Sequence, residues 1–154
     1  MLVKDIYRKN PVTLPETATV KEAVNMFIDR HSNGVLVTDK HEKLVGVLSL
    51  QDIVRSIVPP DMTEHTYLAE AMYKGGFFEE VTNDIADTPV KNIMRKDFLI
   101  AQPETNLMQI AIDFLKNDLY IVPVVENNKL TGVVSRSELK TAFASIFGIE
   151  RKHE

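Results

Sequence analysis

A serine followed three residues later by an acid occurs twice in the chain, as Ser49 with Asp52 and as Ser135 with Glu138. Each pair directly follows a short apolar run, so the sequence predicts that both pairs open a helix. The first turn of a helix offers free backbone N–H groups and a partial positive charge, which favour an anion such as phosphate. A carboxylate there can also accept hydrogen bonds from two adjacent hydroxyl groups of a ligand. These four residues are therefore the first candidates for ligand chemistry.

The same residues also have a purely structural interpretation. A serine at the N-cap and an acid in the first turn stabilise a helix without any ligand. The segment from Ser135 to Glu138 is a capping box in its own right. Both interpretations stay open at the level of the sequence.

Both pairs close a longer unit that occurs twice. Residues 46–52 return in altered form as residues 132–138, at an offset of 86 residues. Residues 3–7 likewise match residues 90–94. A single unit of about 55 residues is marginal for an independent hydrophobic core, so the two repeats are expected to bury apolar surface together.

Each repeat is predicted to contain a strand, a helix, two strands and a helix. The elements of the first repeat are expected at residues 11–14, 20–30, 35–37, 44–48 and 50–58, with Thr19 and Ser49 as helix caps. Those of the second repeat are expected at residues 98–101, 107–115, 121–125, 130–134 and 136–147.

The predicted domains are the first repeat at residues 1–58, an acidic and partly helical linker at 59–88, and the second repeat with its C-terminal helix at 89–154. Within the linker, residues 65–74 predict a short helix. The linker holds seven acidic residues and one lysine, and the whole chain of 154 residues carries a net charge of −4. This balance makes nucleic acid an unlikely partner.

Composition and motifs argue against several other classes of protein. The chain has no cysteine, and its four histidines lack metal-ligand spacing, so no disulfide and no metal site are expected. No nucleophile elbow, glycine-rich phosphate loop or His-Glu-x-x-His motif is present, so we expect no catalytic residues and no enzymatic activity. No leader segment or long apolar run is found, which favours a cytoplasmic protein without a membrane partner.

The duplicated pattern resembles a pair of CBS domains, also called a Bateman module, of the small stand-alone type. The resemblance spans about residues 2–58 and 89–147, and five segments carry it: Asp5-Ile6, Asn10 to Thr13, Gly46 to Asp52, Val122 to Val125, and Gly132 to Glu138. It implies a mixed α/β (α+β) fold, with tandem β-α-β-β-α repeats packed through their sheets in pseudo-two-fold symmetry.

The resemblance also implies a function. Proteins of this family are known for binding AMP, ADP or ATP, and sometimes S-adenosylmethionine or NAD-type molecules, in two clefts between the repeats. The chain is therefore expected to be a regulatory adenine-nucleotide sensor that requires no cofactor, forms a homodimer and acts on an unknown regulated protein through a conformational change. A structural dimerisation module without a ligand is the alternative.

The resemblance assigns ligand-binding residues to two clefts. The first cleft is expected to combine Val47, Ser49 and Asp52 with Met94, Leu99, Tyr120 and Ile121. The second is expected to combine Val133, Ser135 and Glu138 with Tyr7, Asn10, Val12, Asn33 and Gly34. In each cleft the acid would bind the ribose hydroxyls, and apolar side chains would hold the adenine.

Further residues modify this expectation. Arg136, Lys9 and Arg95 are candidates for contacts with phosphate. Glu138 departs from the aspartate that is usual in the family, which makes the second cleft the less certain ribose site. Tyr120 could stack on the adenine ring, or its side chain could block adenine from entering the first cleft. Gly46 and Gly132 would leave space for the close approach of another group.

Overall fold

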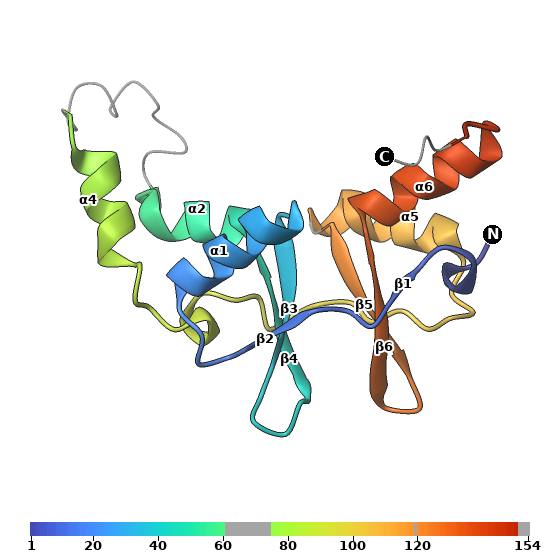
Figure 1. Ribbon diagram of the computed structural model, residues 1–154, viewed down its shortest axis with the longest axis horizontal. Helices are drawn as coiled ribbons and strands as arrows, with labels where there is room; N and C mark the ends of the chain where they lie inside the picture. Colours follow the sequence, from blue (N-terminus) through green and yellow to red (C-terminus); the bar gives the residue numbers. More distant parts are fainter. Residues whose placement is uncertain (61–74, 119, 151–154) are drawn as a thin grey trace. The chain divides into compact units, whose positions relative to one another are not determined.

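The computed structural model describes residues 1–60, 75–118 and 120–150. Its chain divides into two compact units, which we name by their place in the sequence (Figure 1). The central unit is Leu14–Lys96, and the terminal unit combines Met1–Thr13 with Asp97–Glu154. The helix predicted at residues 65–74 lies outside the described residues. Within the described residues, no helix is long and apolar enough to cross a membrane.

The central unit contains a three-stranded sheet in the order β2-β3-β4, with β3 and β4 forming an antiparallel hairpin. Its strands and helices are β2 (Thr13–Pro15), which begins at the boundary of the unit, α1 (Val20–Arg30), β3 (Gly34–Thr38), β4 (Leu44–Ser49), α2 (Leu50–Ile57) and α4 (Phe77–Asp84). The alternating apolar residues of the hairpin pack against the apolar face of α1, so that Val35, Leu48 and Phe27 share one core.

The terminal unit repeats this plan around a sheet in the order β1-β6-β5. Its elements are β1 (Arg8–Lys9), α5 (Leu107–Asn117), β5 (Ile121–Glu126), β6 (Lys129–Ser135) and α6 (Arg136–Ile146). In Figure 1, α5 and α6 lie at one end of the β5–β6 hairpin and the hairpin turn lies at the other. Ile110, Phe114, Val122 and Val134 form the core. The mixed α and β content and the tandem repeats predicted from the sequence are thus confirmed.

Several elements differ from the sequence prediction. Strand β1 (Arg8–Lys9) was not predicted, because the first strand was expected at residues 11–14. The extended segment predicted at residues 98–101 forms only one bridge, in which Ala101 pairs with Val124. Helix α4 was not predicted, because the linker helix was expected at residues 65–74. It begins after Gly76, whose φ of 95° lies in the left-handed region that glycine favours.

The compact units are not the sequence repeats, because the opening segment of each repeat packs on the other repeat's hairpin. Val3 N–H donates to the Thr105 carbonyl over 2.8 Å, and Arg8 pairs with Val133 in β6. In the central unit Arg95 and Val47 exchange two backbone hydrogen bonds of 2.9 Å. The segments are anchored by 3₁₀ turns at Val3–Asp5 and Val90–Asn92, and both Val3 and Val90 are fully buried.

These crossing segments explain the two glycines of the hairpins. A Cβ atom at Gly46 would lie 2.8 Å from Met94 Cγ, and one at Gly132 would lie 2.7 Å from the Arg8 carbonyl oxygen. The space that the sequence suggested for a close approach is filled by the chain's own Met94 and Tyr7. The two contacts differ in kind, because a methionine side chain can rotate away and a paired backbone carbonyl cannot.

The hairpin turn of the central unit is closed by a side chain. Asp39 Oδ1 accepts hydrogen bonds from the N–H groups of His41 and Lys43, over 2.8 and 3.0 Å. The bond from Lys43 N–H is the main cause of a lowered pKa of the Asp39 carboxyl. Beyond this turn the register shifts between Thr38 and Val37, which brings Val37 opposite Gly46.

We expect Gly132→Ala to lower the free energy of unfolding by about 1–3 kcal/mol, because the new methyl group meets fixed backbone. Gly46→Ala should cost clearly less, because Met94 can repack. Urea unfolding followed by circular dichroism measures both values. Equal losses in the two variants would contradict this account of the crossing segments.

Candidate functional site

The first serine–acid pair lies where β4 passes into α2 in the central unit. Ser49 is the N-cap of α2, and its Oγ accepts a hydrogen bond of 3.3 Å from Asp52 N–H. In return Asp52 Oδ2 accepts from Ser49 N–H over 2.9 Å and from the Ser49 hydroxyl over 3.0 Å. Asp52 Oδ1 forms an ion pair of 2.9 Å with Arg55, one helical turn further on. The predicted capping box is thus present, and both carboxylate oxygens have partners within the chain.

The second pair occupies the equivalent position between β6 and α6 in the terminal unit. Glu138 Oε2 accepts hydrogen bonds from Ser135 N–H, over 2.7 Å, and from the Ser135 hydroxyl. Glu138 Oε1 lies 3.8 Å from Nε of Arg8, which comes from β1. The longer side chain of Glu138 therefore reaches the same acceptor position as Asp52, but its second oxygen faces an arginine from another part of the chain.

A third capping box in the chain provides an internal comparison. Thr19 caps α1 and pairs with Glu22 in the same reciprocal way. Glu22 is exposed, whereas Asp52 is only 5% exposed and Glu138 only 7%. Capping a helix does not require a buried carboxylate, and burying a charged group costs free energy unless it is well paired. The burial of Asp52 and Glu138 is therefore not explained by helix capping.

The central unit brings several predicted residues together around Ser49. Gly34 pairs with Ser49 across the hairpin, and Leu50 N–H donates to the Asn33 carbonyl over 2.8 Å. Met94 lies against Gly46, beside the buried Val47. Asn33 and Gly34 were predicted to act with Ser135 and not with Ser49; that predicted role stays a prediction.

The terminal unit likewise gathers residues around Ser135. Ile121 pairs with Ser135 across the β5–β6 hairpin, and the ring of Tyr7 lies against Gly132 next to Val133. Lys9 lies in β1, opposite Gly132. Ile121 was predicted to act with Asp52, and this pairing also stays a prediction.

Tyr120, directly before β5, is part of a stack of three side chains. Its ring meets the buried ring of Phe114 edge-on, with centroids 5.6 Å apart and an interplanar angle of 75°. The guanidinium of Arg136 lies over the Tyr120 ring, with Cζ 3.7 Å from the ring centroid. Tyr120 was predicted for the first cleft and Arg136 as a candidate for a phosphate contact, and the structure places them in direct contact.

The other predicted residues lie outside these clusters of contacts. Leu99 is 40% exposed, Val12 is partly buried, and Asn10 is exposed with a φ of 53°. Their predicted contacts with a ligand stay predictions. The sequence analysis missed Arg8 and Arg55. The spacing of Arg55 from Asp52 on a helix could have identified it, whereas the contact of Arg8 depends on the pairing of β1 with β6.

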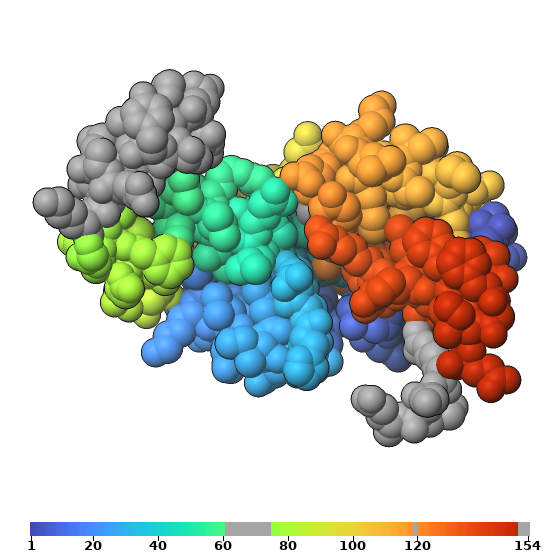
Figure 2. Space-filling model, turned by 90° about the horizontal axis from the view of Figure 1, so that it is seen from above, coloured from blue at the N-terminus to red at the C-terminus, as the bar shows by residue number. Residues whose placement is uncertain are grey.

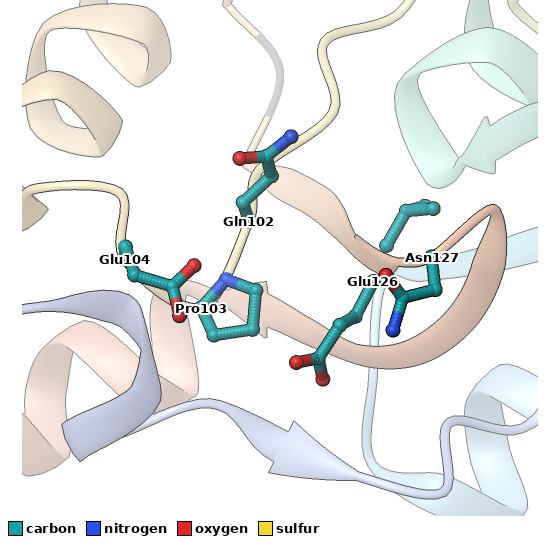
Figure 3. A pocket seen from close by; sticks show the side chains of 6 residues that line it. Gln102, Pro103, Glu104, Glu126 and Asn127 are labelled. Atoms are coloured by element: carbon teal, nitrogen blue, oxygen red, sulfur yellow. The ribbon is translucent and has the colours of Figure 1, made fainter.

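Figure 3 shows a hollow elsewhere in the terminal unit, between the segment before α5 and the β5–β6 turn. Six residues line it: Gln102, Pro103, Glu104, Val125, Glu126 and Asn127. Its volume of about 200 Å³ is below the roughly 300–1,000 Å³ of pockets for small molecules. It contains none of the predicted ligand residues, and we do not regard it as the site.

Comparison with known proteins agrees with this architecture. The family model described as CBS domain matches residues 3–59 and 90–145, which are the two repeats. The chain therefore belongs to the CBS domain family. The resemblance noted in the sequence is confirmed.

An uncharacterised protein of Methanocaldococcus jannaschii, MJ1426, is 30% identical over 152 residues, which cover 90% of this chain and 89% of that protein. Three further relatives from the same organism are longer, and the matches span 40%, 23% and 38% of their lengths.

Two solved structures with similar folds contain ligands. The CBS domain pair of protein MJ0100, in complex with 5′-methylthioadenosine and S-adenosyl-L-methionine, has a TM-score of 0.69 and 24% identity, covering 95% of this chain and 98% of that one. CBSX2 in complex with AMP has a TM-score of 0.67 and 24% identity, with the same coverage. At this identity the likeness shows a shared fold.

Proposed function

We propose that this chain is a regulatory module that binds an adenosine-containing ligand, namely AMP, ADP or ATP, and transmits its presence to a partner protein. The observation that carries this proposal is the burial of Asp52 and Glu138 at two equivalent helix N-termini, while the capping acid Glu22 is exposed. Relatives of the same fold bind AMP, 5′-methylthioadenosine and S-adenosyl-L-methionine, so the shared part of the ligand is adenosine.

The chemistry of each serine–acid pair suits a ribose and a phosphate. A carboxylate accepts hydrogen bonds from the two adjacent ribose hydroxyls, and these bonds to a charged group are stronger than those between neutral groups. Arg55 is mostly exposed and holds Asp52 Oδ1 from the solvent side. A ribose would therefore bind by displacing a mobile arginine, while the bonds from Ser49 to Oδ2 are retained.

Regulation requires that the ligand bind one conformation of the protein more tightly than another. The ligand would stabilise the conformation that closes around it, and a regulated protein would recognise that conformation. The ligand is bound and released without chemical change, so the module has no enzymatic activity of its own.

Isothermal titration of the purified chain tests the binding step with AMP, ADP, ATP, S-adenosylmethionine and NAD. We expect Asp52→Asn to weaken binding of the preferred ligand about 10- to 100-fold, because hydrogen bonds to a charged group contribute about 1.5–3 kcal/mol. Glu22→Gln is the matched control, since it changes a capping acid that is exposed. A folded sample that gives no heat with any of the five ligands would refute the proposal.

A second function, homodimerisation, is favoured by the apolar surface of the terminal unit. On α5 the exposed apolar residues are Met108, Ile112 and Leu115, and on and beyond α6 they are Phe143, Ile146, Phe147 and Ile149. Helices α5 and α6 lie next to each other in the view of Figure 2 and in that of Figure 1. These seven side chains are between 43% and 82% exposed, and exposed apolar residues gathered on neighbouring helices are typical of an interaction surface.

This apolar surface is more extensive on α5 than on α1, where Ile28 corresponds to Leu115 and is also exposed. The residues of α1 that correspond to Met108 and Ile112 are Lys21 and Asn25. Leu115 is 82% exposed, and leaving such a side chain in water is unfavourable compared with burying it in an interface. A second copy of the chain can cover the surface with the same surface of its own.

We expect wild-type chain to sediment as a dimer and Leu115→Glu to sediment as a monomer, because the added charge would be buried without a partner in the interface. Lys116→Glu, a charge change at the next position of the same helix, should leave the dimer intact. Analytical ultracentrifugation at several protein concentrations provides the measurement. A monomeric wild type, or a dimer that survives Leu115→Glu, would contradict this assignment.

A further inference from the structure

Arg136 occupies an unfavourable position for an arginine. It is the first residue of α6, where the partial positive charge of the helix N-terminus repels a cation. The corresponding first residue of α2 is Leu50, so the position does not require a charge. Helix stability therefore does not explain why an arginine stands here.

The acid closest in sequence does not neutralise this arginine. Glu138 directs its carboxylate to Ser135 and Arg8. In the part of the chain that the structure describes, the recorded contact of the Arg136 guanidinium is the face of the Tyr120 ring, 3.7 Å from Cζ to the centroid. The contact is well defined, because the edge of the Tyr120 ring is fixed against buried Phe114.

A guanidinium stacked on a ring keeps its N–H groups directed outward in its own plane, where they can still donate hydrogen bonds. An exposed cation–π contact is weak, whereas a phosphate group can accept two parallel charge-assisted bonds from one arginine. A phosphate near Ser135 would therefore take the guanidinium from the Tyr120 ring. Adenosine and 5′-methylthioadenosine carry no anionic group that could compete with the ring.

We propose that Arg136 is the residue by which the terminal unit distinguishes phosphorylated from unphosphorylated adenosine ligands. When no phosphate is bound, its guanidinium stacks on the Tyr120 ring. This inference rests on the proposed nucleotide binding. It adds that the two serine–acid pairs differ in selectivity, because Leu50 stands in the central unit where Arg136 stands in the terminal unit.

The test compares the affinities of AMP and adenosine, measured by isothermal titration on the full chain. For wild type we expect AMP to bind more tightly than adenosine at the selective site. Arg136→Gln should weaken AMP about 10-fold and leave adenosine within about 2-fold, because only the charge-assisted bonds to phosphate are lost. Lys140→Gln, which removes an exposed charge one turn further along α6, should change neither affinity.

Several outcomes would overturn the inference. If Arg136→Gln weakens both ligands equally, the residue does not select for phosphate. If Lys140→Gln lowers the AMP affinity as much as Arg136→Gln does, the effect is one of general charge. If neither ligand binds to the wild type, the proposed function itself fails, and this result is distinct from unchanged selectivity in a protein that does bind.

A second pair of variants tests whether stacking on the Tyr120 ring competes with phosphate for the Arg136 guanidinium. Tyr120→Leu removes the ring face and should raise the preference for AMP over adenosine about 2- to 5-fold, the contribution expected of an exposed cation–π contact. Tyr120→Phe retains the ring and should keep the wild-type preference. An unchanged preference in Tyr120→Leu would show that the stack does not compete with phosphate. The ratio of affinities corrects for any direct contact of Tyr120 with the adenosine part.

Discussion

The backbone pairing of the two opening segments is the constraint on which the rest of the structure depends. Arg8 pairs with Val133, and Arg95 pairs with Val47, so the second strand of each hairpin pairs with the opening segment of the other repeat. The same pairing buries Val3 and Val90 in the two cores. It also brings other groups close to both hairpin glycines, where an added Cβ would meet the Met94 side chain at Gly46 and the Arg8 carbonyl oxygen at Gly132. Neither repeat is complete without the other, which accounts for a fold built from two units that are each too small to be stable alone.

The candidate site depends on the junctions between the hairpins and the helices that follow. At each junction a serine ends the strand, and an acid in the first helical turn returns to it. The carboxylates are buried, but hydrogen bonds and an arginine compensate their charge, so neither Asp52 nor Glu138 is an isolated buried charge.

Duplication has not produced two identical sites. Asp52 pairs with an arginine of its own helix, whereas Glu138 pairs with an arginine that crosses from the beginning of the chain. The residue after the serine is apolar in the first repeat and is the stacked Arg136 in the second. The outer faces of the helices differ as well, because apolar residues of α5 replace polar residues of α1. One repeat plan therefore carries two different helix faces and two different environments of the serine–acid pair.

The sequence by itself determined the repeats, the helix caps at Thr19, Ser49 and Ser135, and the order of strands and helices, because these follow from local spacing and periodicity. It also indicated the CBS domain family through motifs that recur in order. Only the tertiary structure decided the pairing of Glu138 with Arg8, the stacking of Arg136 on Tyr120 and the exchange of the opening segments. The geometry of these contacts is set by the pairing of β1 with β6 and by core packing, which no local pattern encodes. The ion pair of Asp52 with Arg55, in contrast, follows from helical spacing. Tertiary structure also decided that Asp52 and Glu138 are buried while Glu22 is exposed, because all three acids have the same capping pattern in the sequence.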